Sequence, residues 1–303
     1  MKFFLVYVFI LAKVHGIGRN PSLRIVAGFD CNPVEYPFYA LVIISSNKGN
    51  KICGGSLVAP NFVLTAAHCC VENDIKRYNI QTGTESIDGK FDYKVNVTDI
   101  YIHAKYDPKE YNYDACMLKL HMQICKRQST DYLDIAFFDY SKFNILTQCS
   151  RVISAGFGVQ HRNERKGILQ DHFPFPKKNL QCTLLTLLSN KECSKFWKKG
   201  FYNDTMLCAI DPTPRKSDVC YGDSGGPLMC GDIQIGIISY SRGCGFNNTP
   251  GVFTKVSKIK DFILNILKDD YNYLQLSFKK SLGTKLFMTS HYYFLIIVIF
   301  MSV

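Results

Sequence analysis

The heptapeptide Gly222-Asp223-Ser224-Gly225-Gly226-Pro227-Leu228 has the composition of a tight turn that presents a serine hydroxyl. Such a hydroxyl is a weak nucleophile at neutral pH and needs a neighbouring base to take its proton. It also needs backbone N–H groups directed at the oxygen that becomes negative during attack. Glycines on both sides of Ser224 let the backbone approach a substrate closely, because they carry no Cβ. The heptapeptide is therefore either an ordinary turn or the nucleophilic turn of a hydrolase.

Two upstream motifs favour the hydrolase. Residues 64–70 form a small-residue segment around His68, and Asp114 opens the largely apolar run at 113–120. Taken singly, a histidine is usually structural and an aspartate at a strand edge is usually a turn residue. Taken together with Ser224, they give the chain order His, Asp, Ser of a known nucleophilic triad.

With these three motifs in this order, the chain from Ile25 to about Lys268 resembles the chymotrypsin/trypsin family of serine endopeptidases. The resemblance implies an all-β fold of two packed six-stranded antiparallel barrels with a C-terminal helix. A domain of this length is common for such folds. Strand-like runs between turn residues fit this class, at Phe38–Ile44, Phe62–Thr65, Arg151–Ala155 and Ile233–Ser239.

One segment near the end of the domain is predicted to be helical. Ser257 is a suitable N-cap. The apolar residues that follow it share one helix face: Ile259, Phe262, Ile263, Ile266 and Leu267.

The resemblance assigns a role to each member of the triad. Ser224 is expected to be the nucleophile, His68 the general base and Asp114 the residue that orients the imidazole. The backbone N–H groups of Gly222 and Ser224 are expected to form the oxyanion hole. All three triad residues are present, which favours an active enzyme. The rival is a non-catalytic relative that binds a partner through basic loops, although the substituted triad typical of such proteins is missing.

The residues just before the nucleophile bear on specificity. By resemblance, Asp218 lies at the floor of the primary pocket, and a buried carboxylate there favours a cationic substrate side chain, so we predict cleavage after Arg or Lys. Val219 offers no hydroxyl, which should disfavour the shorter Lys. Serine in place of the usual glycine at Ser241, and the nearby Arg242, leave altered primary specificity as an alternative. The pocket walls are assigned to Ser239, Tyr240, Ser241, Gly243 and Gly251.

The ends of the chain suggest processing. Residues 1–16 have the charged start, apolar run and small-residue end of a signal peptide, which predicts a secreted, extracellular protein. Residues 17–24 are then an activation propeptide. By resemblance, cleavage after Arg24 by an activating protease frees the Ile25 ammonium, which pairs with Asp223 in a protease domain spanning 25–268. Residues 269–303 are a C-terminal extension whose apolar end is short for a transmembrane helix, so a membrane tether is a hypothesis.

The 13 cysteines of a secreted chain predict disulfides rather than a zinc site. Because His68 and Asp114 must meet, Cys70 and Cys116 are expected to pair. The resemblance implies the remaining pairs and leaves Cys125 over, as a buried thiol or an intermolecular bridge. These pairs are Cys31–Cys182, Cys53–Cys69, Cys149–Cys230, Cys193–Cys208 and Cys220–Cys244.

The net charge of +11 suggests polyanions as candidate partners beside protein or peptide substrates and protein inhibitors. A solvated basic face is the plainer explanation, and no nucleic-acid module is present. Residues 83–88 match a calcium loop poorly, and no metal or cofactor is expected. Asn96, Asn203 and Asn247 are glycosylation acceptors by pattern. The basic residues considered are Arg162, Arg165, Lys166, Lys177, Lys178, Lys195, Lys198 and Lys199.

Overall fold

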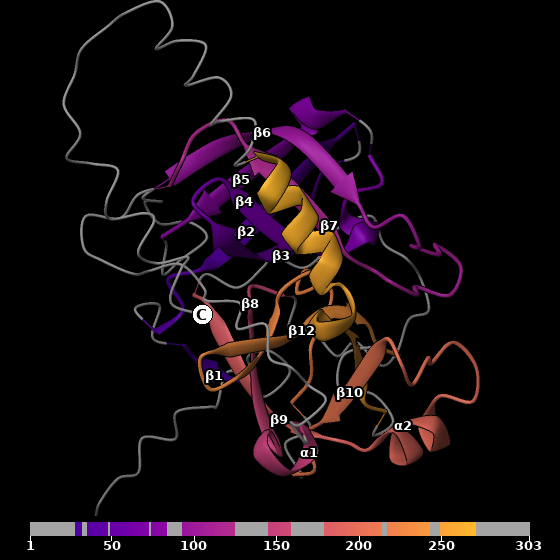
Figure 1. The fold of residues 1–303 in the computed structure, drawn as a ribbon. Helices are drawn as coiled ribbons and strands as arrows, with labels where there is room; N and C mark the ends of the chain where they lie inside the picture. Colours follow the sequence, from indigo (N-terminus) through magenta and orange to yellow (C-terminus); the bar gives the residue numbers. More distant parts are fainter. Residues whose placement is uncertain are drawn as a thin grey trace, which may run out of the picture.

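A computed structural model gives the architecture of the chain. It describes residues 28–31, 35–47, 49–72, 74–83, 93–124, 145–158, 179–213, 217–242 and 249–270. In these ranges two β-barrels lie one above the other, and the chain completes the first before it enters the second (Figure 1).

The N-terminal barrel is closed and antiparallel, with strand order β2-β3-β4-β7-β6-β5. Apolar side chains at alternate positions of these strands fill its interior, among them Val42, Leu64, Ile80 and Leu118, all fully buried. Its strands are β2 (Tyr39–Ser46), β3 (Gly49–Ala59), β4 (Phe62–Thr65), β5 (Tyr78–Thr82), β6 (Tyr93–Ile102) and β7 (Cys116–Leu120).

The C-terminal barrel has the strand order β9-β10-β13-β12-β11-β8 and closes through the pairing of β8 with β9. A short strand, β1 (Phe29–Asp30), pairs with the first two residues of β9. Its own core includes Val152, Leu185, Leu228 and Phe253. The six barrel strands are β8 (Arg151–Gly156), β9 (Gln181–Leu187), β10 (Met206–Ile210), β11 (Pro227–Cys230), β12 (Ile233–Tyr240) and β13 (Gly251–Lys255).

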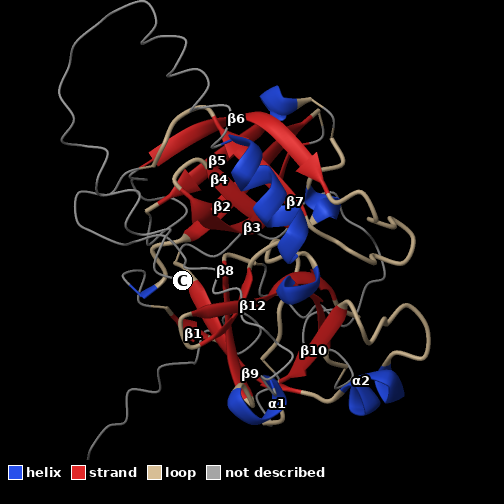
Figure 2. Cartoon of the chain, viewed as in Figure 1, coloured by secondary structure: helices blue, strands red, loops and turns tan. Residues whose placement is uncertain are grey.

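Helices are few and short in the described part of the chain (Figure 2). The α2 helix begins with a capping box, in which the Ser189 hydroxyl and the Glu192 carboxylate accept each other's backbone N–H. The labelled helical elements are η2 (Ala67–Cys69), η3 (Ile75–Arg77), α1 (Ile145–Gln148), α2 (Asn190–Phe196) and η4 (Val256–Lys258).

The final helix covers residues 260–270 and returns to pack on the first barrel (Figure 1). Ile259 and Ile263 are buried in the core cluster of that barrel, and the helix end is tied by a 2.5 Å ion pair between Lys119 Nζ and Asp270 Oδ1. The expected apolar face is therefore correct. The expected cap is wrong, because Ser257 lies inside η4 and the α-helix starts three residues later.

The predicted fold class, two six-stranded antiparallel barrels with a C-terminal helix, is confirmed. The four predicted strands correspond to β2, β4, β8 and β12, with boundaries that differ by at most two residues. Their identification depended on β-branched and aromatic runs between turn residues, which is the strongest local signal for buried strands.

Candidate active site

His68 and Asp114 come together because of strand register in the first barrel. Thr65 on β4 lies opposite Cys116 on β7, so the residues just after β4 and just before β7 emerge at the same end of the barrel. The imidazole Nδ1 is 2.8 Å from Asp114 Oδ2, and the His68 backbone N–H donates to Oδ1 at 2.9 Å. Asp114 is fully buried, whereas the His68 side chain remains 16% exposed. The carboxylate thus fixes the imidazole in orientation and in tautomer.

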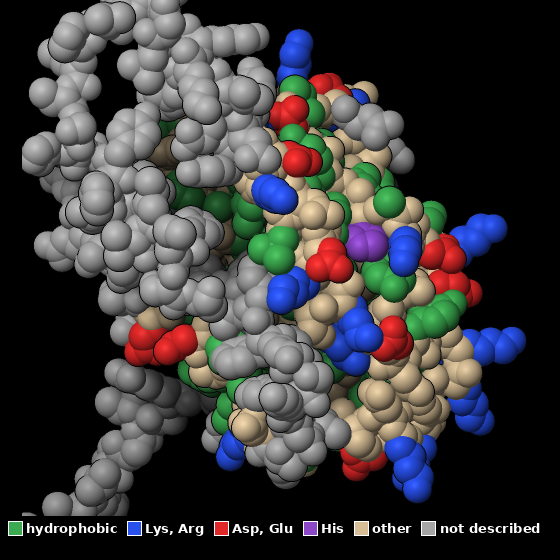
Figure 3. Space-filling view, viewed as in Figure 1, with side chains coloured by type: hydrophobic (Ala, Val, Ile, Leu, Met, Phe, Trp, Pro, Cys, Tyr) green, Lys and Arg blue, Asp and Glu red, His purple; other side chains and the backbone are tan. Residues whose placement is uncertain are grey.

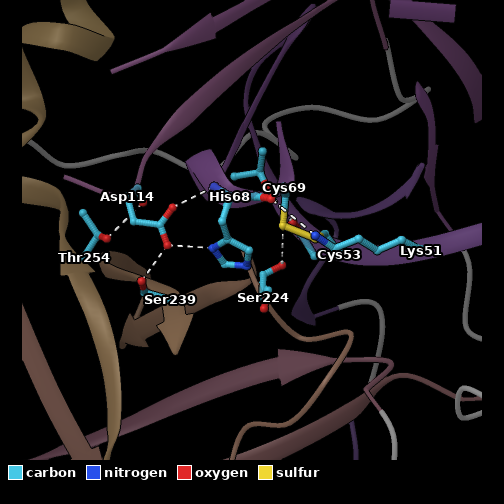
Figure 4. A network of polar contacts seen from close by, with 10 residues as sticks. Lys51, Cys53, His68, Cys69, Asp114, Ser224, Ser239 and Thr254 are labelled. Atoms are coloured by element: carbon cyan, nitrogen blue, oxygen red, sulfur yellow. Dashed lines mark hydrogen bonds and ion pairs between the residues drawn. A yellow bond between two sulfur atoms is a disulfide. The ribbon is translucent and has the colours of Figure 1, made fainter. Parts of the chain in front are cut away.

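The C-terminal barrel completes the hydrogen bonding of Asp114. The Ser239 hydroxyl donates to Asp114 Oδ2 at 2.6 Å, and the Thr254 hydroxyl donates to the Asp114 carbonyl at 3.0 Å (Figure 4). A buried carboxylate needs such partners to stay charged. The sequence interpretation placed Ser239 only in the pocket wall, and it missed both contacts because they join residues more than a hundred positions apart.

Ser224 lies on the side of the imidazole opposite Asp114, next to the second ring nitrogen (Figure 4). The turn that carries it is docked on the first barrel, where the Gly54 N–H donates to the Ser224 carbonyl at 2.7 Å. Gly222 and Gly225 have φ values of +95° and +84°, which favour glycine. A Cβ on Gly225 would lie 2.1 Å from Thr65 Oγ1, so this turn fits only without a side chain.

Two disulfides enclose the His68 segment. Cys53–Cys69 joins it to β3, and Cys70–Cys116 joins it to the start of β7 just after Asp114. Cys53, His68 and Cys69 have their sulfur and nitrogen atoms within 4.8 Å of one another. The two sulfurs are already bonded to each other, so this group does not form a metal site.

Five of the six expected disulfides lie among the described residues. Cys220 is also disulfide-bonded, while Cys244 and Cys125 lie outside the described residues. The five pairs are Cys31–Cys182, Cys53–Cys69, Cys70–Cys116, Cys149–Cys230 and Cys193–Cys208.

Asp223 is buried beneath the candidate oxyanion turn. Its carboxylate accepts the N–H of Gly158 at 2.7 Å and the N–H of Cys220 at 2.8 Å. Burial raises the pKa of Asp223 to about 6, and these two hydrogen bonds oppose the rise. No cation pairs with it among the described residues. Arg24 and Ile25, the expected cleavage site and partner, lie outside the described residues.

A tyrosine hydroxyl is buried close to this carboxylate. Tyr39 Oη has no hydrogen bond of normal geometry within the described part of the chain, although it lies near the Phe157 N–H. Burial and the neighbouring Asp223 raise the pKa of Tyr39. A buried hydroxyl and a buried carboxylate therefore lie close enough to interact electrostatically, next to the turn that carries Ser224.

The residues expected at the pocket floor lie together. Asp218 is buried, and a Cβ added to Gly251 would lie 3.4 Å from Asp218 Oδ1 and 3.1 Å from Val219 Cγ2. The residue before Asp218 is anchored by Asp211, whose carboxylate accepts a hydrogen bond from the Ser217 hydroxyl at 2.7 Å. A side chain at position 251 would therefore crowd both Asp218 and Val219.

The far wall contains an aromatic row that sequence reasoning did not identify. The Tyr111 ring lies 5.5 Å from the His68 ring and 5.6 Å from Tyr240, and Tyr240 lies 5.1 Å from Trp197. The Arg242 guanidinium stacks 4.6 Å above Trp197. Arg242, one of the two residues that leave altered primary specificity open, therefore has a cation–π partner in Trp197. Ser241 is half-buried, and Gly243 lies outside the described residues.

The remaining predicted surface features are only partly described. Asn96 and Asn203 are exposed, as glycan attachment requires, while Asn247 lies outside the described residues. Figure 3 shows Lys and Arg side chains interspersed with Asp and Glu over the described part of one face. Of the basic residues considered, Lys195, Lys198 and Lys199 are exposed, and the other five lie outside the described residues.

The comparisons with known proteins agree with this geometry. The family model described as Trypsin matches residues 25–263, which is most of the chain. The chain belongs to the trypsin family. As a member of that family it is a serine endopeptidase, a hydrolase that acts on proteins or peptides.

Several curated relatives in this family align over nearly their whole length. Chymase of Papio hamadryas is 33% identical over 82% of this chain and 93% of its own. Trypsin II-P29 of Gallus gallus is 32% identical over 87% and 97%, and Hypodermin-B of Hypoderma lineatum is 28% identical over 81% and 89%.

Proposed function

We propose that this trypsin-family protease hydrolyses peptide bonds through an acyl-enzyme on Ser224, with His68 as base and Asp114 as the orienting group. The observation that carries this proposal is the Nδ1–Oδ2 contact of 2.8 Å, which holds the second ring nitrogen toward Ser224 (Figure 4). Asp114 is fully buried and the His68 side chain is mostly buried, which strengthens the electrostatic interaction between them.

The chemistry then follows in two steps. His68 takes the hydroxyl proton while Ser224 Oγ bonds to the scissile carbonyl carbon, and the carbonyl electron pair moves to its oxygen. The N–H groups of Gly222 and Ser224 stabilise this oxyanion. The carbonyl re-forms, the C–N bond breaks, and His68 gives its proton to the leaving amine. Water, deprotonated by His68, repeats the sequence and releases the acid product and the free serine.

We further propose cleavage after Arg, and less readily after Lys. Support comes from the buried Asp218, which lies beside Gly251 where a side chain would crowd it. The stacking of Arg242 on Trp197 adds support, because it engages a cation that could otherwise compete with the substrate side chain. A guanidinium reaches a carboxylate with two parallel N–H bonds, while the shorter ammonium gains no hydroxyl partner from Val219.

A peptide library cleaved by the activated enzyme tests this specificity. We expect Arg before the scissile bond to give the highest kcat/KM, followed by Lys. Asp218→Asn should lower kcat/KM for Arg substrates about 10²-fold or more, because it removes the only charge proposed to recognise them. Preference for an uncharged residue in the unsubstituted enzyme would instead establish the alternative of altered primary specificity.

The chain is proposed to be a zymogen that a second protease activates by cleavage after Arg24. The buried Asp223, which lacks a cation among the described residues, supports a state that awaits the Ile25 ammonium. An Arg24→Gln chain should resist activation and remain nearly inactive. Covalent labelling of Ser224 by a serine-directed phosphonate, before and after cleavage, tests both steps. Absence of label in the cleaved chain would indicate the rival, a protease-like binding protein.

Secretion is proposed from the leader at 1–16 and is supported by five disulfides, which persist in oxidising compartments. Glycosylation at the exposed Asn96 and Asn203 would be consistent with it, and protein inhibitors and polyanions remain proposed partners. Among the described residues no helix has the length and apolarity needed to cross a membrane. The tether proposed for 269–303 is tested by partition between detergent and water, where purely aqueous behaviour would contradict it.

A further inference from the structure

Lys51 is a cation beside the candidate catalytic residues that the proposed mechanism does not use. It lies on β3, two residues before Cys53, and its Nζ donates to the His68 carbonyl at 3.3 Å. Figure 4 shows the side chain extending over the Cys53–Cys69 disulfide, on the side of the imidazole away from Asp114. The ammonium therefore lies beside the disulfide, on the same side of the imidazole as Ser224.

This ammonium has no carboxylate partner within the described ranges. Glu72, the nearest acidic group outside the triad to act on it, is engaged with Arg77 at 2.9 Å, and Asp114 is engaged with His68. Partial burial is the main influence on Lys51 and lowers its pKa, while Asp114 and Glu72 oppose that change. By accessible surface Lys51 is an exposed residue, so its ammonium, with only a carbonyl as partner, can be reached by a substrate carboxylate and can bind it.

The orientation of a bound peptide follows from the proposed pocket. The Ser239–Ser241 segment, assigned to the residue before the scissile bond, lies at the end of β12 in the C-terminal barrel and contacts Asp114 through Ser239. The peptide must then leave Ser224 on the opposite side, across the Cys53–Cys69 disulfide. Lys51 lies on that side of the imidazole, beside the disulfide, and residues of an extended peptide advance only about 3.3 Å each.

We propose that Lys51 determines specificity for the leaving half of the substrate by favouring Asp or Glu within the first two residues after the scissile bond. This inference rests on the proposed triad and pocket. Exposed charge pairs contribute modestly, so we expect about a fivefold preference in kcat/KM for Glu over Gln at the favoured position. The preference should shrink as salt is added, because the pair is reached by solvent.

The test uses the full-length, activated enzyme and matched peptides. Each peptide carries the same preferred residue before the scissile bond and Glu, Gln or Lys at the first or second position after it. We expect Lys51→Met to abolish the Glu/Gln ratio, Lys51→Glu to reverse it in favour of Lys, and Lys51→Arg to restore it. Lys94→Glu, on the exposed side of β6, is the control for a change in net charge and should leave the ratio unchanged.

The outcomes separate this inference from the proposed function. Equal loss of kcat/KM on all peptides in Lys51→Met would mean that Lys51 only supports the His68 backbone, which overturns the inference. So would a Glu/Gln ratio of one in the unsubstituted enzyme that is labelled at Ser224. Failure of phosphonate labelling after cleavage would overturn the proposed triad, and the inference would fall with it.

Discussion

The two barrels hold their shares of the active site by different means. The N-terminal barrel positions His68 and Asp114 covalently, through Cys53–Cys69 and Cys70–Cys116. The C-terminal barrel positions Ser224 by backbone fit, with positive-φ glycines and a buried carboxylate below them. The proposed base and orienting acid are therefore held by disulfides. By our proposal, the nucleophile Ser224 depends instead on close packing and on the charge of the buried Asp223.

By this contrast the first barrel supplies rigidity, and the second barrel contains the part of the site at which activity is controlled. A disulfide lowers the entropy of the unfolded chain and does not by itself respond to proteolysis. A buried carboxylate without a cation is costly and responds strongly when a cation arrives. Changes in the first barrel should therefore act mainly on stability, and changes under Ser224 mainly on activity.

The largest effect is expected where the two barrels touch. Gly225→Ala places a Cβ 2.1 Å from Thr65 Oγ1 and 2.5 Å from the Gly54 carbonyl, on a backbone with φ of +84°. The turn must shift, and we expect kcat/KM to fall about 10³-fold, since displaced oxyanion donors alone cost 10²–10³. Activity of the cleaved enzyme on a peptide ester measures this.

Gly231→Ala is the matched control for that prediction. Gly231 also has positive φ, +57°, but a Cβ there meets nothing within 4 Å. It should cost about 1 kcal/mol of stability and little activity. Similar losses of activity in both variants would mean that backbone strain, rather than the barrel contact, is what matters.

Removing the Cys70–Cys116 disulfide from the first barrel should lower stability more than activity. Cys70→Ala with Cys116→Ala opens a link between residues 46 apart, and we expect a loss of about 3–4 kcal/mol in unfolding free energy. Because the hydrogen bonds of Asp114 remain, kcat should fall less than tenfold. Urea unfolding and initial rates measure the two quantities. A collapse of kcat with unchanged stability would reverse the assignment of roles.

Asp223 should make the uncleaved chain sensitive to pH. Its folded pKa of about 6 exceeds its ordinary value of 3.8, so the stability it contributes is present below about pH 4 and is lost as the pH rises through 6. The difference corresponds to about 3 kcal/mol. The measurement is urea unfolding of uncleaved Ser224→Ala with and without Asp223→Asn. Between pH 4 and 7, the unfolding free energy should fall by about 3 kcal/mol more in the protein that keeps Asp223. Parallel curves would contradict it, since Asp211 and the other carboxylates are common to both proteins.

Much of this contrast was predictable from sequence, because it depends on local motifs. The glycines around Ser224, the cysteines beside His68 and Asp114, and the apolar face of the last helix all lie within a few residues of a recognisable signal. The capping residue of that helix was wrong because Ser257 is followed by one turn of η4, and the transition from one helix type to the other leaves no clear local signal.

The contacts that tune the site were not predictable in the same way. Tyr111 reaches His68 from a backbone with φ of +54°, an uncommon conformation for a tyrosine, and Tyr39 reaches Asp223 across the two barrels. Lys51 lies 17 residues from the carbonyl it contacts. Each contact depends on how two strands or barrels pack together, and no local pattern in a single sequence predicts that packing.

The smallest predicted effect concerns the bond that joins the two halves. Ser239→Ala removes the 2.6 Å hydrogen bond from β12 to Asp114, leaving the carboxylate held only from its own barrel. A hydrogen bond to a charged group contributes about 1.5–3 kcal/mol, and we expect kcat to fall about tenfold with KM nearly unchanged. Ser154→Ala, which removes a buried 2.8 Å bond to the Pro227 carbonyl in the same barrel, should lower stability without that loss of kcat. Equal kcat values for the two variants would show that the Asp114 carboxylate is held well enough without Ser239, so that Thr254 is the contact through which the second barrel supports Asp114.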